Sequence, residues 1–171
     1  MSDLHDESLW PIRIRRLPRA KNGLPIPYTA YIDGNGVPDF RILDAPKRLK
    51  CLRDRLCGIC GTKLEYWIVF IGGPVSCTAR QFLDPAMHPE CADFSLRYCP
   101  HLARPKSHYS TRPVPTEIQQ SMVMSDIRPD KFGRYRTRSY RMYMRDNDQL
   151  ALADAPVEIT WHSDKSVPKG E

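Results

Sequence analysis

The chain has 171 residues and a formal net charge of +6, and 41% of its residues are hydrophobic and 27% charged. This composition is typical of a globular protein and excludes a disordered or fibrous chain, and the length allows one domain. No apolar run approaches the roughly 18 residues that cross a bilayer, and the N-terminus lacks the basic and apolar segments of a secretory signal. The sequence therefore predicts a cytoplasmic protein, whose positive charge favours acidic partners such as nucleic acid.

Residues 11–21, PIRIRRLPRAK, carry five basic residues and no acidic one. Proline disfavours a helix because it lacks a backbone N–H and its ring clashes with the preceding turn. Two prolines in this stretch therefore predict that residues 1–22 form a basic N-terminal arm or an edge strand. The arginines of this arm are candidates for contact with an acidic partner: Arg13, Arg15, Arg16 and Arg19.

Turn and cap signals define the elements that follow the arm. The sequence DGNG at residues 33–36 predicts a hairpin between strands near 28–32 and 38–43. Asp44 is suited to cap a helix with Pro46 in its first turn, and leucines recur there at helical spacing. The other positions of this helix predict a solvated face, with contact to an acidic partner as the alternative. They are mostly basic: Lys47, Arg48, Lys50, Arg53 and Arg55.

Six cysteines raise the question of a disulfide framework, a redox pair or a metal site. Disulfides are rare in a reducing cytoplasm, which favours metal binding or simple burial. Cys57 and Cys60 stand in the sequence CGICG, whose glycines allow a tight turn that directs both thiols at one metal. A thioredoxin-like redox pair would precede a helix in a βαβ unit, whereas a strand is predicted after this pair.

A second pair of metal donors, His88 and Cys91, occurs in the sequence HPEC. Residues three apart on a helix share a face, and Pro89 suits a first helical turn. The intervening residues 61–87 indicate a strand, a glycine turn and a second strand. The sequence therefore predicts an α+β fold with a treble-clef zinc finger, in which a knuckle and a β-hairpin precede a helix that supplies two ligands. Cys₃His is a standard set for one structural zinc ion, with Cys99 as the spare candidate for the fourth ligand.

A tetrahedral site with four protein ligands leaves no position for a catalytic water, so the zinc is predicted to be structural and the protein non-enzymatic. The His88-Pro89-Glu90 triplet resembles the H-x-E motif of zinc deaminases. That motif needs a C-x-x-C downstream, whereas here the C-x-x-C lies upstream. The predicted hairpin, residues 62–83, has no histidine that a treble-clef nuclease would use, and such a nuclease stays as the alternative function.

The C-terminal part begins with a predicted proline-rich connection at residues 103–116. C-terminal strands are predicted over 132–162, including one long strand at 134–145, before a flexible tail at 164–171. The long strand is rich in side chains that hold phosphate and stack on bases. The same residue types are enriched in protein interfaces and in ordinary charged edge strands, so three interpretations stay open. The candidate binding residues are Arg134, Arg136, Arg138, Tyr140 and Arg141.

Residues 56–102 resemble a group of small uncharacterised zinc proteins of actinobacteria and their phages. The shared features are a C-x-x-C-G knuckle, a glycine-containing strand, H-x-x-C and a following C-P-x-L. The matching positions are Cys57, Cys60, Gly61, His88, Cys91, Cys99 and Pro100. The resemblance implies a prokaryotic or viral cytosolic protein and supplies no catalytic role.

Together these patterns predict one zinc-stabilised domain at residues 23–163, with the zinc module at 51–102. The predicted function is a binding protein, encoded by a phage or mobile element, whose arginine- and tyrosine-rich surfaces engage nucleic acid. The partner can also be a host protein that handles nucleic acid, such as a defence or transcription complex. A metal-dependent nuclease and a purely structural phage protein are the alternatives.

Overall fold

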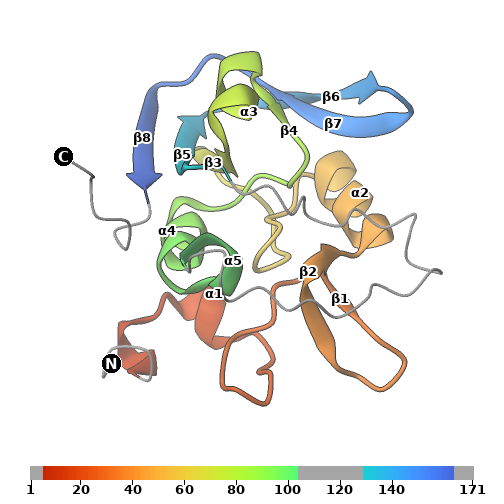
Figure 1. The fold of residues 1–171 in the computed structure, drawn as a ribbon, viewed down its shortest axis with the longest axis vertical. Coiled ribbons are helices and arrows are strands. Elements are labelled where there is room, and N and C mark those ends of the chain that lie inside the picture. The colour runs from red at the N-terminus through yellow and green to blue at the C-terminus, as the bar shows by residue number, and fades with distance from the viewer. Residues whose placement is uncertain (1–5, 104–128, 164–171) are drawn as a thin grey trace.

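The computed structural model describes residues 6–103 and 129–163, which form the predicted mixed α+β fold with antiparallel sheets (Figure 1). The tail predicted at 164–171 and nearly all of the connection predicted at 103–116 lie outside the described residues. None of the helices in the described parts of the chain is long and apolar enough to cross a membrane.

The N-terminal segment contains two short helices in place of the predicted arm or edge strand. A 3₁₀ helix, η1, spans Glu7–Leu9, and α1 spans Ile12–Arg15 directly after Pro11. The prediction that proline excludes a helix here is wrong, because proline is tolerated where the first turn leaves backbone N–H groups unpaired. Trp10 and Ile14 are 3% and 0% exposed, so this segment is part of the core.

The hairpin and helix predicted after this segment are both present. β1 (Ala30–Ile32) pairs antiparallel with β2 (Pro38–Leu43) around the DGNG turn. α2 (Ala45–Asp54) begins at the Asp44 cap, whose carboxylate accepts a 3.0 Å hydrogen bond from the backbone N–H of Lys47. Its predicted solvated basic face is only partly solvated, because the side chain of Arg48 is buried.

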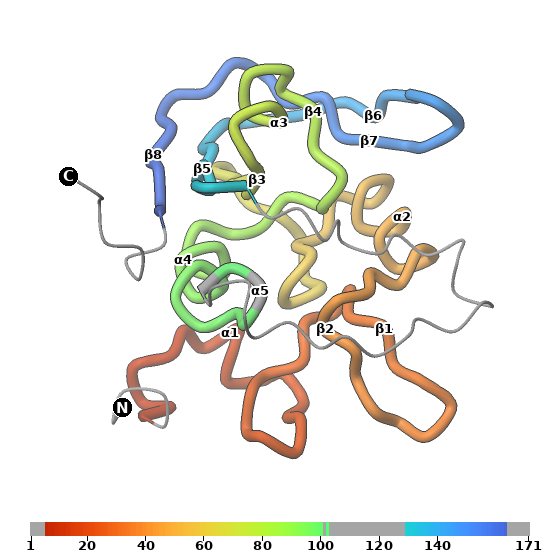
Figure 2. The backbone as a smooth tube through the Cα atoms, in the orientation of Figure 1, coloured from red at the N-terminus to blue at the C-terminus, as the bar shows by residue number. Residues whose placement is uncertain are grey.

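Two three-stranded antiparallel sheets form the other half of the molecule. The first has the order β3-β5-β8, and its strands span Ile68–Gly72, Lys131–Thr137 and Glu158–Ser163. The second has the order β4-β7-β6, with strands at Gln81–Phe82, Asp148–Ala153 and Tyr140–Arg145. Figure 2 shows that the chain crosses from the first sheet to the second between β5 and β6.

The long strand predicted over residues 134–145 is therefore wrong, because two strands in different sheets replace it. Its first part lies in β5 and its second part in β6, with the break at Arg138 and Ser139. β7, which the sequence analysis did not predict, follows a two-residue turn in which Asp146 and Asn147 have φ of 48° and 68°. Positive φ at both positions is typical of the tight turns that join paired strands.

The predicted second strand of the zinc-finger hairpin is also replaced. Residues Pro74–Ala79 form α3, and only the two residues of β4 in the predicted hairpin segment 75–83 are extended. Pro74 suits the first turn of a helix. Val75 and Cys77 would lie on the same face of a strand, but Val75 is 81% exposed and Cys77 is buried, so the burial pattern does not fit a strand. β3 pairs with β5 instead of with the following segment, and an isolated antiparallel bridge joins its Val69 to Met87, just before the next helix begins at Pro89.

The apolar strand β3 has core residues on both of its faces. Val69 and Ile71 pack with Trp10 and Ile14 under α4 (Pro89–Tyr98), and α5 (Pro100–Ala103) follows that helix. Ile68 and Phe70 face the second core, where the Phe70 ring stacks on Phe82 with ring centroids 4.6 Å apart. Burial on both faces explains why the strand is continuously apolar rather than alternating.

Candidate metal centre

A tight turn after α2 carries the first two donors. Gly61 has φ of +72°, and its backbone N–H donates a 2.8 Å hydrogen bond to the carbonyl of Cys57. The N–H of Cys57 in turn donates to the carbonyl of Thr62 at 2.8 Å. A Cβ at Gly61 would lie 2.8 Å from the Tyr28 ring, so both the left-handed backbone and the close approach require glycine.

The N-terminus of α4 carries the other two donors. His88 is the N-cap residue, and Cys91 lies in the first turn, with Pro89 and Glu90 between them. Backbone hydrogen bonds of 2.8 and 2.9 Å between Val69 and Met87 hold this start of the helix against β3. The prediction that a helix begins at His88 is confirmed.

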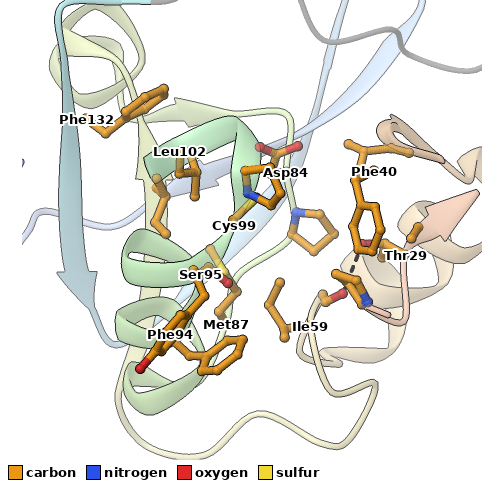
Figure 3. Close-up of a pocket in the computed structure, with 18 of the residues that line it drawn as sticks. Thr29, Phe40, Ile59, Asp84, Met87, Phe94, Ser95, Cys99, Leu102 and Phe132 are labelled. Carbon is orange, nitrogen blue, oxygen red and sulfur yellow. Dashed lines mark hydrogen bonds between the residues drawn. The ribbon is translucent and has the colours of Figure 1, made fainter. Parts of the chain in front are cut away.

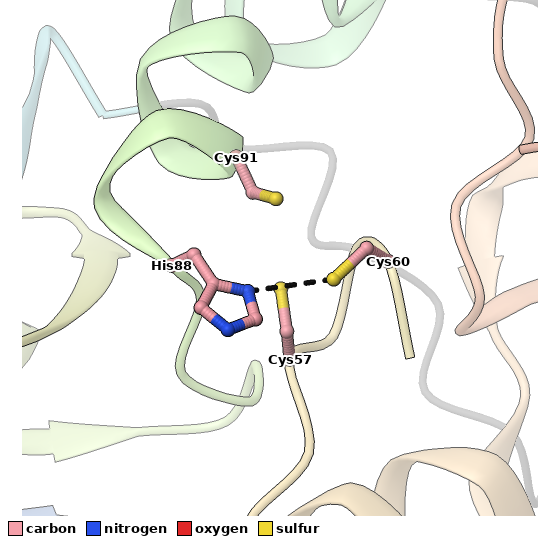
Figure 4. Close-up of side chains that lie close together, drawn as sticks. All are labelled: Cys57, Cys60, His88 and Cys91. Carbon is pink, nitrogen blue, oxygen red and sulfur yellow. Dashed lines mark hydrogen bonds between the residues drawn. The ribbon is translucent and has the colours of Figure 1, made fainter. Parts of the chain in front are cut away.

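The four predicted donors lie close together. Their ligand atoms, three sulfurs and one imidazole nitrogen, are all within 4.8 Å of one another. Figure 4 shows these side chains pointing toward one another, with Nδ1 of His88 3.4 Å from Sγ of Cys60. Cys57, His88 and Cys91 are 0% exposed, and Cys60 is half-buried. The group can hold a single zinc ion, and Cys99, the spare candidate, lies outside it.

The second ring nitrogen of His88 supports this assignment of ligand atoms. Nε2 lies 2.9 Å from the carbonyl oxygen of Lys63, so it carries the proton and donates to that carbonyl. The lone pair of Nδ1 then faces the three thiols. Histidine ligands of metals usually donate their other N–H to a carbonyl or carboxylate in this way.

One thiol of the group, that of Cys60, is poised for deprotonation. The pKa of Cys60 is held well below its usual range, because the Cys57 and Cys91 thiols donate hydrogen bonds to its thiolate. The pKa of Cys91 is raised correspondingly, and hydrogen bonds with Cys57 and Cys60 raise the pKa of His88 to about 10. A metal ion binds the Nδ1 lone pair only when it displaces the proton that these thiols favour there, so metal binding at this site releases protons. One thiolate is therefore already favoured, and a cation at the centre allows the other thiols to ionise as well.

Two further cysteines are buried away from this group. Burial raises the pKa of Cys51 to about 12 and that of Cys77 to about 11. Thiols with such high pKa values stay protonated at neutral pH and behave as small apolar side chains. We therefore assign both to packing.

Several of the predicted binding residues are engaged within the protein. Arg13 forms ion pairs with Glu65 and Glu90 beside the metal donors, and Arg134 pairs with Asp93. Arg19 pairs with Glu7 and stacks on Trp10. Tyr140 is buried, and its hydroxyl donates a 2.7 Å hydrogen bond to the carbonyl of Leu52. Arg136 is half-buried and pairs with Glu158. The remaining predicted residues are exposed: Arg15, Arg16, Arg138 and Arg141.

The half-buried Arg136 and the exposed Arg138 belong to a cluster that the sequence pattern did not indicate. Tyr66 and Trp67 lie edge to face with ring centroids 4.9 Å apart. The guanidinium of Arg136 lies 4.9 Å from the Trp67 ring, and that of Arg138 lies 5.1 and 5.2 Å from the Tyr66 and Trp67 rings. We call these four residues the aromatic–arginine cluster. The only sign of this cluster in the sequence is the adjacent Tyr-Trp pair. The same pair also fits the strand predicted within residues 61–87, so the sequence does not single it out as a surface site.

A cavity of about 430 Å³ lies between the N-terminal segment, the β1–β2 hairpin and α4 (Figure 3). Its walls are mainly apolar and include Ile59, Met87 and Phe94. Its polar lining includes Thr29, whose hydroxyl donates to the carbonyl of Gly58, and the carboxyl group of Asp84. The cavity lies beside the metal donors and shares no ligand atom with them.

The carboxyl group of Asp84 predicts a pH dependence of stability. Burial raises its pKa from 3.8 to about 6, against the opposing effect of Arg48. The folded state therefore holds this proton more tightly than the unfolded chain, so the contribution of Asp84 to stability is fully present below pH 3.8 and is lost as pH rises through 6. Relative to Asp84→Asn, the wild-type protein should lose about 1 kcal/mol of unfolding free energy between pH 5 and pH 7. Urea unfolding at both pH values measures this difference, and parallel pH profiles would contradict it.

Comparisons with protein-family models, curated proteins and solved structures found no match to this chain. Its function is therefore inferred from the geometry of the described residues. A buried set of three thiols and one imidazole suits a tetrahedral ion that stabilises the fold. In the aromatic–arginine cluster, Tyr66 and Arg138 are exposed, whereas Trp67 and Arg136 are half-buried.

Proposed function

We propose that this chain is a non-enzymatic binding protein, held together by one structural zinc ion, that engages nucleic acid through exposed arginine and aromatic side chains. The observation that carries the proposal is the aromatic–arginine cluster, which combines the two side-chain types that bind phosphate and stack on bases. The net charge of +6 supports attraction to a polyanion. The resemblance of residues 56–102 to zinc proteins of actinobacteria and their phages supports the further proposal that the protein is cytoplasmic and is encoded by a phage or mobile element.

Within this proposal the zinc module is a treble clef with an insertion. The knuckle at Cys57 and Cys60, the Val69–Met87 bridge and the first turn of α4 occur in the order that the fold requires. α3 and β4 would then be the insertion between the two halves of a minimal hairpin. Four ligands complete a tetrahedral shell, which supports a structural rather than a catalytic ion.

The test of the proposed function is binding of nucleic acid as a function of salt. If arginines neutralise several phosphates, the logarithm of the association constant should fall linearly with the logarithm of salt concentration, by about 0.7–0.9 per phosphate. Fluorescence anisotropy with labelled oligonucleotides measures the slope. Charge reversal of the exposed Arg141 and of the internally paired Arg134 gives matched variants for locating the contact surface.

Three other outcomes would contradict the proposal in different ways. Salt-insensitive capture of one host protein would favour an adaptor or inhibitor of a nucleic-acid-handling complex. Magnesium-dependent cleavage of the oligonucleotide would favour the nuclease alternative. The absence of both binding and cleavage would favour a structural phage protein.

A further inference from the structure

The aromatic–arginine cluster exists because of one strand register. In the β3–β5 pair, Ile68 lies opposite Thr137, so the residues just before β3 meet those just after β5. Tyr66 and Trp67 are thereby placed beside Arg138, and Arg136 reaches the Trp67 ring from within β5. The four side chains alternate as guanidinium, indole, guanidinium and phenol. Such stacking of cations on aromatic faces is attractive by about 0.5–1 kcal/mol per contact at exposed sites.

The two rings hold the Arg138 side chain in place, and its guanidinium N–H groups remain available to bind a ligand. Within the described residues no hydrogen bond or ion pair engages its guanidinium, which lies over the Tyr66 and Trp67 rings. Arg136, in contrast, pairs with Glu158 at 3.2 Å. A guanidinium that is held in place without using its N–H donors loses little further entropy when it binds a phosphate.

Tyr66 is the most exposed aromatic side chain of the cluster. Its side chain is 62% exposed, although tyrosine rings in folded proteins are more often largely covered. The backbone around it is anchored on both sides. The carbonyl of Lys63 accepts the hydrogen bond from His88, and Ile68 is fully buried in β3. The ring is therefore an exposed flat surface on a segment that the metal donors and the sheet hold in place.

We propose that the aromatic–arginine cluster is a stacking site for a single-stranded nucleic acid. One unpaired base lies on the exposed Tyr66 ring, and Arg138 binds the neighbouring phosphate. A base within a duplex is covered by its neighbours and cannot lie on the ring, so single strands are preferred over duplexes. This inference rests on the proposed function and specifies its substrate class and its contact residues.

The experiment measures the affinity of the folded, zinc-loaded protein and of three variants for two labelled ligands. One ligand is a single-stranded oligothymidine of about 15 nucleotides, and the other is a duplex of equal length. Tyr66→Ala should weaken single-strand binding by about 5- to 100-fold, the range found when a stacking ring is removed. Tyr66→Phe keeps the ring and should stay within about twofold. Arg138→Gln should weaken single-strand binding and reduce the salt slope by about one phosphate. Zinc content and melting temperature confirm that each variant is folded.

The outcomes separate the inference from the function on which it rests. If salt-dependent binding persists while Tyr66→Ala and wild type bind the single strand equally, the stacking site is wrong and the proposed function stands. Equal affinity for the single strand and the duplex would also overturn the inference. If neither oligonucleotide binds at low salt, both the inference and the proposed function are wrong.

Discussion

The Cys57→Ser variant, like the wild-type protein treated with a zinc chelator, is expected to lose the structure of at least residues 57–99. A structural zinc site contributes on the order of 10–16 kcal/mol of apparent binding free energy. That value exceeds the net stability of many domains, which is roughly 5–15 kcal/mol. Circular dichroism and amide hydrogen exchange before and after chelation measure the loss, and elemental analysis measures zinc per chain.

The loss should extend to the N-terminal segment, because the metal donors belong to the core. Cys57 and Cys91 pack in the same cluster as Trp10, Ile14 and Val69. When the knuckle and the start of α4 separate, these apolar side chains lose the surface against which they are buried. Of the three tryptophans, only Trp10 is buried, so in a variant that combines Trp67→Phe with Trp161→Phe the emission should shift to longer wavelength as the zinc is removed.

Two matched variants distinguish loss of a metal ligand from loss of any cysteine. Cys99→Ser changes a thiol outside the donor group, so zinc content should stay at one per chain. His88→Cys should also retain zinc, because Cys₄ is a standard structural set, although the donor to the Lys63 carbonyl is lost. Zinc retention and full structure in Cys57→Ser would contradict the structural role.

The parts of the site that could be predicted depend on signals within a few residues. The glycines around Cys60 set the shape of the turn, and Pro89 suits the first turn of the helix that follows His88. The same locality explains the correct β1–β2 hairpin, where the turn sequence alone determines which strands meet. These features need no information about the rest of the chain.

The parts that could not be predicted depend on contacts between distant residues. Gly133 looks like a weak point in a strand, but a Cβ there would lie 2.6 Å from Sγ of Cys77, so the contact with α3 requires glycine. Trp67 and Arg138 meet only because β3 pairs with β5 rather than with the following segment. Residue type alone could not distinguish the buried Arg48 from the exposed Lys50 on the same helix.

The second large expected effect is a loss of stability when Arg48 is replaced. Its side chain is 3% exposed, and its guanidinium donates hydrogen bonds of 3.0 Å to the carbonyl of Leu83 and 2.8 Å to that of Gln149. It thereby joins α2 to the β6–β7 hairpin and to the segment before the metal donors. Burial lowers the pKa of Arg48, while Asp84 and Asp148 favour its charged form.

Arg48→Met should lower the unfolding free energy by about 2–4 kcal/mol, because it removes hydrogen bonds from a charged, buried donor to two carbonyls, each worth about 1.5–3 kcal/mol, while methionine recovers part of the packing. Methionine fills much of the same volume but removes the guanidinium donors from the Leu83 and Gln149 carbonyls and the positive charge that opposes the burial of the Asp84 carboxyl. Urea unfolding of the zinc-loaded protein measures the loss. Lys50→Met, on the exposed side of α2, is the matched control and should change stability by less than about 0.5 kcal/mol.

A double-mutant cycle separates the charge interaction from the hydrogen bonds. If the uncompensated Asp84 carboxylate accounts for part of the loss, Asp84→Asn should be less destabilising in Arg48→Met than in the wild-type protein, or should restore stability there. The coupling should shrink as pH falls below 6, because Asp84 is then protonated and carries no charge for Arg48 to balance. A coupling that is unchanged between pH 5 and pH 7 would show that Arg48 acts through its two carbonyl contacts alone.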